Sequence, residues 1–318
     1  MSREGRPAMT ASPSARLIES IESVAPETWD ALANPAGGRT NPFVSHAFLS
    51  ALETSGAATA RTGWQPVHAL LEDKGRVIGA APMYVKNHSY GEYVFDHGWA
   101  EAFERAGGDY YPKLQVAVPF TPATGPRLLT GADASVRPLL AQALMAFATR
   151  LGVSSLHITF PTAEEAQALN GLGFLERHDQ QFHWQNAGYR DFGEFLAALS
   201  SIKRKNLRRE RAEALSAGIE VEWITGSDLT EGHWDAFFAF YMDTGSRKWG
   251  QPYLTREFFS LVGESMADRI LLVMAKRDGR HIAGALNFVG SDTLYGRNWG
   301  AVEHHPFLHF ELCYYQAI

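Results

Sequence analysis

Two short stretches of the chain place ionisable side chains beside aromatic ones, a composition that suits a concave pocket better than a solvated loop. The first stretch is SYGEYVFDHGW, and the second is GRNWGAVEHHPFLHFE. Carboxylates and imidazoles in such a pocket can accept and release protons. For any single residue, the competing interpretation is an ordinary hydrogen-bonded turn residue. The candidates are Tyr90, Glu92, Asp96, His97 and Trp99 in the first stretch and Arg297, Asn298, Trp299, Glu303, His304, His305, His309 and Glu311 in the second.

Metal binding by the second stretch is a separate question. His305 and His309 are four residues apart, and Glu311 follows closely. Pro306 interrupts any helix that would place both imidazoles on one face, and no H-E-x-x-H motif is present. We therefore predict no metal site here. The chain also lacks a G-x-S-x-G elbow, a Walker loop and a Rossmann fingerprint, so hydrolase, NTPase and dehydrogenase functions have no support.

Positive charge is concentrated in the segment SSIKRKNLRRERAEAL, although the whole chain carries a net charge of -6. Six basic residues fall within nine positions: Lys203, Arg204, Lys205, Arg208, Arg209 and Arg211. Ser200 or Ser201 is a suitable N-cap, and Gly218 a suitable end, for a helix over these residues. The first turn of that helix would then hold three cations, where the helix dipole favours anions.

A bound anion would turn this unfavourable placement into a favourable one, because backbone N–H groups and basic side chains would converge on it. The competing interpretation is a solvated helix face whose charge is partly offset by Glu210 and Glu213. Because of the density of charge and its position at the helix start, the bound anion and the solvated helix face both remain open as interpretations.

The elements that carry these residues show a faint internal repeat. VHALLEDKGRVIGAAPMYV (residues 67–85) aligns without gaps with LLVMAKRDGRHIAGALNFV (residues 271–289), and each predicts a β-hairpin whose charged turn ends in Gly-Arg. PFVSHAFLSAL (residues 42–52) likewise resembles PYLTREFFSLV (residues 252–262), where Ser45 or Thr255 would cap a helix. Between them, Asp191 and Glu194 predict a capping box before a short helix. Two such matches suggest a duplicated α/β unit.

Composition indicates a globular protein in a reducing compartment. Of the 318 residues, 45% are hydrophobic, and Cys313 is the single cysteine, which we interpret as a packed core thiol. The polar N-terminus is not a secretory signal, and LLAQALMAFATRLG is too short to span a bilayer. We expect a cytoplasmic, soluble protein without a membrane span. The pI of about 6.1 argues against a simple nucleic-acid binder.

The segment FLAALSSIKRKNLRRERAEALSAGIEVEWI resembles the FemAB-like (Fem-type) transferases of the GNAT acyltransferase superfamily. Two helices, the second rich in Arg and Lys, a Gly and a strand carry this resemblance. HSYGEYVFDHGWAEAF and YYPKLQVAVPFTPATGPRLL also resemble the family, as does AKRDGRHIAGALNFVGSDTLYGRNWGAV. Together these stretches cover most of the chain from about residue 40. The residues that match the basic-helix pattern are Arg204, Asn206, Leu207, Arg208, Arg209, Gly218 and Val221.

The resemblance implies an α/β (α+β) fold of two tandem GNAT-like domains, each a mixed, mainly antiparallel sheet flanked by helices. We place a flexible tail at residues 1–14, the first domain at 15–185 and the second at 186–318. The final FLHFELCYYQAI reads as an amphipathic helix that stops without a cap, so we expect the second domain to be truncated at its C-terminus.

The resemblance also implies acyl or aminoacyl transfer to an amine acceptor in peptidoglycan or cell-wall precursor metabolism. The donor would be aminoacyl-tRNA or acyl-CoA, met by the basic helix, with no tightly bound cofactor. The alternatives are an acetyl-CoA-dependent N-acetyltransferase and a non-catalytic module that binds a cell-wall precursor. One departure is that residues 297–301, RNWGA, lack the glycine spacing of the usual CoA pyrophosphate loop.

Under this interpretation the candidate residues take roles. Amine acylation needs a base for the ammonium proton and donors for the carbonyl oxygen. The predicted catalytic residues are Glu92, Asp96, His97, Glu303, His309 and Glu311; the predicted donor-binding residues are Lys203, Arg204, Lys205, Arg208 and Arg209; the predicted substrate-pocket residues are Tyr90, Trp99, Arg297, Asn298 and Trp299.

Overall fold

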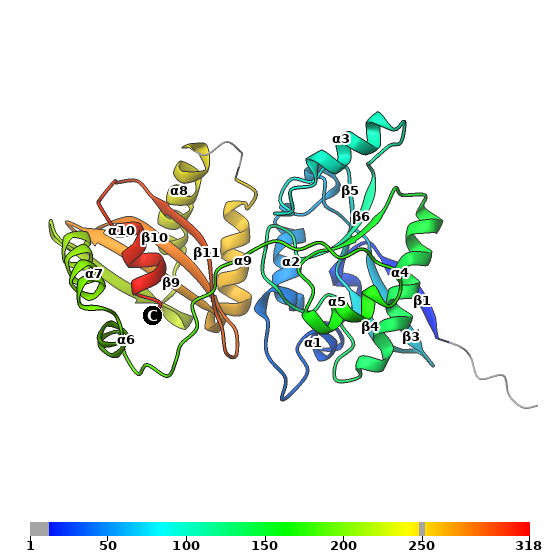
Figure 1. Cartoon of the computed structure of the whole chain (residues 1–318), viewed down its shortest axis with the longest axis horizontal. Helices are drawn as coiled ribbons and strands as arrows, with labels where there is room; N and C mark the ends of the chain where they lie inside the picture. Colours follow the sequence, from blue (N-terminus) through cyan, green and yellow to red (C-terminus); the bar gives the residue numbers. More distant parts are fainter. Residues whose placement is uncertain (1–12, 248–251) are drawn as a thin grey trace, which may run out of the picture. The chain divides into compact units, whose positions relative to one another are not determined.

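A computed structural model describes residues 13–247 and 252–318 of the chain (Figure 1). They form two compact units. Unit 1 holds the described residues up to Glu53 together with Ala58–Glu176, and unit 2 holds Thr54–Ala57 and Arg177–Ile318. Both combine helices with mainly antiparallel sheets, so the predicted α/β class is confirmed. The domain limits at 15–185 and 186–318, and the assignment of each half as GNAT-like, stay predictions. Of the predicted N-terminal tail, residues 1–12 lie outside the described part, while Ser14 already begins a strand.

Unit 1 contains two short sheets, with strand orders β1-β3-β4 and β2-β5-β6-β7. Among the described strands of this unit, β6 and β7 pair in parallel and the others pair antiparallel. Pro66 and Pro82, which have no N–H group to donate, lie where the first sheet gives way to the second. The strands are β1 (Ser14–Ile18), β2 (Gln65–Pro66), β3 (His68–Asp73), β4 (Arg76–Ala81), β5 (Met83–Lys86), β6 (Lys113–Val116) and β7 (Leu156–Ile158), and the helices are α1 (Pro26–Ala33), α2 (His46–Thr54), α3 (His97–Arg105), α4 (Arg137–Leu151) and α5 (Ala163–Asn170).

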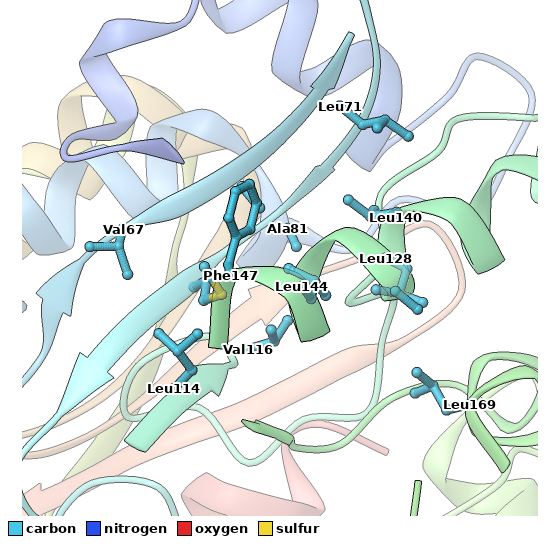
Figure 2. Packing of buried hydrophobic residues seen from close by; sticks show 13 residues of the cluster. Val67, Leu71, Ala81, Leu114, Val116, Leu128, Leu140, Leu144, Phe147 and Leu169 are labelled. Carbon is cyan, nitrogen blue, oxygen red and sulfur yellow. The ribbon is translucent and has the colours of Figure 1, made fainter. Parts of the chain in front are cut away.

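The core of unit 1 lies between these strands and α4 (Figure 2). Leu140, Leu144 and Phe147 recur at helical spacing and pack against strand residues such as Leu71 and Val116. Burying each of these side chains contributes roughly 1.5–3 kcal/mol. This packing holds β5 and β6 side by side, and the polar cluster described below depends on that pairing.

Unit 2 is built on one antiparallel sheet with strand order β11-β10-β9-β8. Val273 and Ala275 of β9 face the C-terminal helical segment, whose Leu308 and Leu312 pack against them. Met274 faces the opposite side, where α8 brings Phe237 against the strands. The elements are α6 (Phe192–Ala198), α7 (Ser201–Ala214), β8 (Ile219–Ile224), α8 (Glu231–Arg247), α9 (Arg256–Met266), β9 (Ile270–Arg277), β10 (Arg280–Val289), β11 (Leu294–Ala301), α10 (Leu308–Phe310) and a π-helical turn (Glu311–Tyr315).

Both predicted hairpins form, and they turn in the same way. Lys74 and Gly75 have φ values of 50° and 78°, and Asp278 and Gly279 have values of 52° and 74°. Two successive positive φ values characterise the two-residue turn that matches strand twist. The predicted helix caps also form, since the Thr255 hydroxyl accepts a hydrogen bond from the Phe258 N–H and the Ser45 hydroxyl accepts one from Phe48. The repeat therefore has a structural counterpart in each unit.

The two helices predicted around residues 191–216 also form, with small differences. The Asp191 carboxylate caps α6 by accepting from the Glu194 N–H at 2.9 Å. Glu194 in turn accepts from the Arg190 N–H, not from the Asp191 N–H, so the predicted capping box is only half formed. The second helix, α7, ends at Ala214, a few residues before the predicted stop at Gly218. Within residues 13–247 and 252–318, no helix is long and apolar enough to cross a membrane.

Candidate functional site

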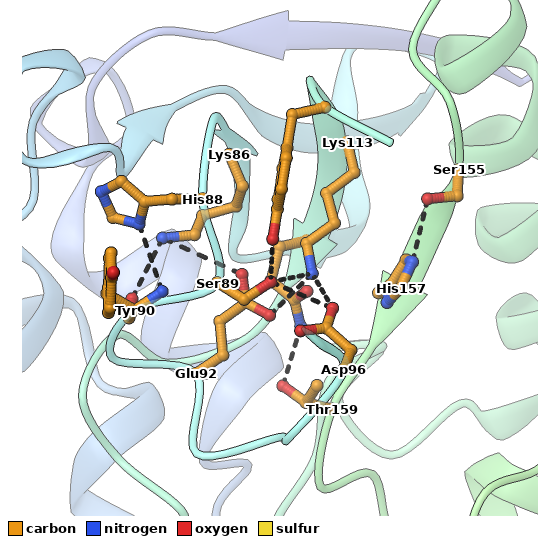
Figure 3. Close-up of polar contacts among 12 residues, drawn as sticks. Lys86, His88, Ser89, Tyr90, Glu92, Asp96, Lys113, Ser155, His157 and Thr159 are labelled. Atoms are coloured by element: carbon orange, nitrogen blue, oxygen red, sulfur yellow. Dashed lines mark hydrogen bonds and ion pairs between the residues drawn. The ribbon is translucent and has the colours of Figure 1, made fainter. Parts of the chain in front are cut away.

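Unit 1 contains a buried charge cluster, which we define as Lys86, Ser89, Glu92, Asp96 and Lys113 (Figure 3). Lys86 ends β5 and Lys113 begins β6, and the register of the two antiparallel strands sets them directly opposite one another. Two buried ammonium groups side by side repel and must be offset by anions. The loop after β5 supplies those anions as Glu92 and Asp96.

Lys113 is the centre of this buried charge cluster. Its Nζ donates to Asp96 Oδ2 at 2.6 Å, to Glu92 Oε2 at 2.9 Å and to Ser89 Oγ at 2.9 Å. All three donor positions of the ammonium are therefore used. Asp96 Oδ2 also accepts a hydrogen bond from the Tyr110 hydroxyl at 2.8 Å.

Lys86 is held more loosely. Its Nζ lies 3.6 Å from the centroid of the Trp64 ring and 3.9 Å from Glu92 Oε1, and it donates to the Tyr90 carbonyl at 3.4 Å. Glu92 Oε1 and Asp96 Oδ1 are buried and have no hydrogen-bond partner among the described residues. The cluster thus contains two carboxylate oxygens that accept no hydrogen bond from the described residues, and one ammonium group with only long contacts.

Burial shifts the pKa values of this cluster in different directions. Desolvation lowers the pKa of Lys86 to about 7, although Glu92 acts to raise it. Desolvation raises the pKa of Glu92 against the attraction of Lys113. Burial also acts to raise the pKa of Asp96, but hydrogen bonds from Lys113, Ser89 and Tyr110 lower it overall. Lys86 therefore titrates near neutral pH, where an exposed lysine stays fully charged.

We expect the free energy of unfolding of the wild type, relative to Lys86→Met, to rise with pH between about 7 and 9.5. In that window the unfolded lysine, with a pKa of about 10.4, still binds a proton that the folded one has released. The expected gain in the free energy of unfolding over this window is about 3 kcal/mol. Urea unfolding of both proteins at several pH values measures it, and a difference that stays constant with pH would show that Lys86 titrates normally in the folded state.

Of the residues predicted in the first stretch, the structure brings together Glu92 and Asp96. His97 is exposed and lies outside the cluster. Tyr90 and Trp99 have 63% and 64% of their surface exposed. Their assignment to a substrate pocket stays a prediction. Tyr90 contributes its backbone carbonyl, which accepts from Lys86 and from Trp64 Nε1.

The sequence analysis missed both lysines of the cluster. Each stands inside an apolar strand pattern, PMYVK before the loop and KLQVAV after it. A lysine at such a position is almost never fully buried unless it is paired. That signal, combined with the carboxylates of the intervening loop, would have indicated a buried ion network.

In unit 2 the five predicted donor-binding cations lie on α7 as expected, with Lys203 and Arg204 in its first turn and Lys205 directly after it. Lys203, Lys205, Arg208 and Arg209 are exposed, and no carboxylate of the described residues pairs with them. Arg204 donates to the Ala197 carbonyl at 3.1 Å. The Ser200 side chain makes no capping bond, so the first turn of α7 has neither an acidic residue nor a capping side chain.

Arg211 differs from the other cations of this segment. It donates to both carboxylate oxygens of Glu311, at 2.9 Å and 2.7 Å, and its guanidinium stacks 4.1 Å from the Phe192 ring centroid. Glu311 is fully buried. The contact ties α7 to the C-terminal segment, so Glu311, which we predicted to be catalytic, lies in an internal ion pair.

The second predicted stretch separates into distinct places. Trp299 and His309 line a cavity of about 290 Å³ with Thr244 and Arg247. The Trp299 and His309 rings meet edge to face, with centroids 5.1 Å apart. The Thr244 hydroxyl is buried and has no partner among the described residues. The neighbouring Gly300 lies against the Phe240 backbone so closely that a Cβ would come within 2.3 Å of it, which fixes β11 against α8.

The remaining predicted residues of this stretch lie outside that cavity lining. Arg297 and Asn298 are half-buried on β11 beside an irregularity in its pairing with β10. Glu303 pairs with Arg277 and His305, each at 2.9 Å. His305 is thus paired with the Glu303 carboxylate, and Glu311 with the Arg211 guanidinium. Their side chains do not meet that of His309 in a common metal-binding arrangement of the described residues.

These features belong to a two-unit α/β protein with a buried ion network in one unit, and with a cation-rich helix and a small cavity in the other. Residues 20–318 match the FemAB-like family, described as peptidoglycan biosynthesis/recognition, and the chain belongs to this family. No curated protein matches the chain in sequence. Among solved structures, the crystal structure of FemX is similar over 81% of this chain and 77% of its own, with 14% identity and a TM-score of 0.43.

Proposed function

We propose that the protein transfers an acyl or aminoacyl group to an amine of a peptidoglycan or other cell-wall precursor. The observation that carries the proposal is the first half of α7, where exposed cations occupy a helix start without a local carboxylate. Membership of the FemAB-like family supplies the peptidoglycan context. An anionic ligand would interact favourably with both the side chains and the helix dipole.

We propose aminoacyl-tRNA as the donor, with its phosphates facing α7. Resemblance to Fem-type transferases supports this choice, and so does the absence from residues 297–301 of the usual CoA-loop glycine spacing. Phosphate contacts of this kind are strongly salt-dependent. Because aminoacyl-tRNA is found in the cytoplasm, we place the activity there.

The cavity lined by Thr244, Trp299 and His309 offers groups for the reaction. The acceptor amine would attack the donor carbonyl, forming a C–N bond while the ester C–O bond breaks. In the proposed step His309 takes the proton from the attacking amine and gives it to the departing ester oxygen, which leaves as a hydroxyl group. The unpartnered Thr244 hydroxyl would donate to the developing oxyanion.

A donor screen tests this proposal. We expect transfer of a radiolabelled amino acid from a mixed aminoacyl-tRNA pool to a peptidoglycan precursor with a free amine, and none from acyl-CoA. His309→Asn should lower the rate by roughly 10²–10⁴-fold without loss of tRNA binding. Transfer from acyl-CoA alone would replace the proposed donor, and precursor binding without turnover of any donor would indicate a binding module.

A further inference from the structure

A second polar cluster lies on the sheet face of unit 2 that α8 covers. We define the three-ligand cluster as Glu222 of β8, His233 of α8 and His281 of β10. One ligand atom from each of the three side chains lies within 4.8 Å of the other two. We propose that this cluster binds a divalent transition metal, with zinc as the best match.

Strand pairing brings two of the three residues together. Lys276 of β9 is the register partner of Glu220 on β8 and of His281 on β10, so this row crosses all three strands. Glu222 lies two residues along β8 and reaches across β9, so that its Oε1 is 2.6 Å from His281 Nε2. His233 approaches from the first turn of α8, and its ring centroid lies 5.5 Å from that of His281.

The spacing of the three ligand atoms is close to the spacing that a bound zinc ion requires. Zn–N and Zn–O bonds of about 2.0–2.2 Å place tetrahedral ligand atoms roughly 3.3–3.6 Å apart. The Glu222–His281 contact must widen by somewhat less than 1 Å to admit the ion, and flexible side chains that are half-buried can move that far. Two imidazoles and one carboxylate leave a fourth position for water, as in open zinc sites.

Neighbouring groups orient two of the ligands. Lys276 Nζ holds Glu222 Oε2 at 2.6 Å, which leaves Oε1 for the ion. The Thr230 backbone N–H donates to His233 Nδ1 at 3.2 Å, and the Thr230 hydroxyl lies 3.1 Å from the same atom, so these contacts fix the orientation of the ring. Because Nδ1 accepts this N–H, a zinc ion bound at Nε2 would displace the proton that Nε2 carries. Because Lys276 carries a like charge close to the ion, we expect micromolar rather than nanomolar affinity.

Titration of the untagged full chain with Zn²⁺ tests the site directly. We expect one ion per chain, a rise in Tm with Zn²⁺ and reversal by a chelator. Glu222→Gln, His233→Ala and His281→Ala should each weaken binding by at least about tenfold. Replacement of Zn²⁺ by Co²⁺ should give the intense visible bands of a four-coordinate ion.

His305→Ala is the matched control, because His305 also pairs with a carboxylate, Glu303 at 2.9 Å, but no third ligating group of the described residues joins that pair. It should leave zinc binding unchanged. Circular dichroism of each ligand variant without metal separates lost binding from lost folding. The proposal is overturned if the wild type binds no zinc, or if His305→Ala weakens binding as much as the three ligand variants do.

Discussion

Lys113→Met lowers the free energy of unfolding of unit 1 by about 3–5 kcal/mol, the largest stability effect expected in the chain. The substitution keeps the volume of the side chain but leaves Glu92 and Asp96 buried without their common donor. The nearest remaining cation is Lys86, whose Nζ is 3.9 Å from Glu92 Oε1 and whose own pKa is already lowered to about 7. Urea unfolding near neutral pH measures the loss.

Arg16→Met in the same unit is the matched control for that measurement. Arg16 also forms an ion pair, with Glu72 at 2.8 Å, but both side chains are partly exposed. Such a pair contributes only about 0–1 kcal/mol. A second variant, Lys113→Met with Glu92→Gln and Asp96→Asn, removes the stranded charges and should recover part of the stability. Equal losses for Lys113→Met and Arg16→Met would contradict the buried network.

The elements that local chemistry specifies were predictable from the sequence. The basic segment was predicted to form a helix with cations in its first turn, and α7 has them there. The two hairpins were predicted from a repeated Gly-Arg turn, and both form with the same pair of positive φ values. In each case the residues that determine the element lie within a few positions of one another, so their spacing in the sequence is enough to predict it.

The groups that depend on long-range pairing were not predictable in this way. Lys86 meets Lys113 only because of the register of β5 and β6. Arg211 and Glu311 are 100 residues apart, and their contact removes both from the sets of free cations and free carboxylates. His281 meets Glu222 across an intervening strand. The Lys86–Lys113 and Glu222–His281 contacts depend on sheet register, which the sequence does not specify without the strand order. The Arg211–Glu311 contact depends on how α7 packs against the C-terminal segment.

We expect Arg208→Gln with Arg209→Gln to weaken aminoacyl-tRNA binding by on the order of tenfold or more at about 0.1 M salt. Both side chains are exposed on α7, and neither has an ion-pair partner among the described residues. Each cation that contacts a phosphate releases about one counterion, so the slope of log K against log salt should fall by roughly 1.5–2. Glutamine retains helix propensity, so α7 should stay folded. Filter binding over a salt series measures both quantities.

The control for this charge change is Arg269→Gln with Arg280→Gln, which removes the same two charges from exposed positions of unit 2 outside α7. If the field of α7 alone attracts the donor, the control should change affinity less than about threefold and leave the salt slope nearly intact. Equal weakening by both double variants would mean that net charge, and not the helix, governs binding. Unchanged binding in the α7 variant would return these cations to the solvated face that remained the competing interpretation, and the cation-rich start of α7 would lose its functional meaning.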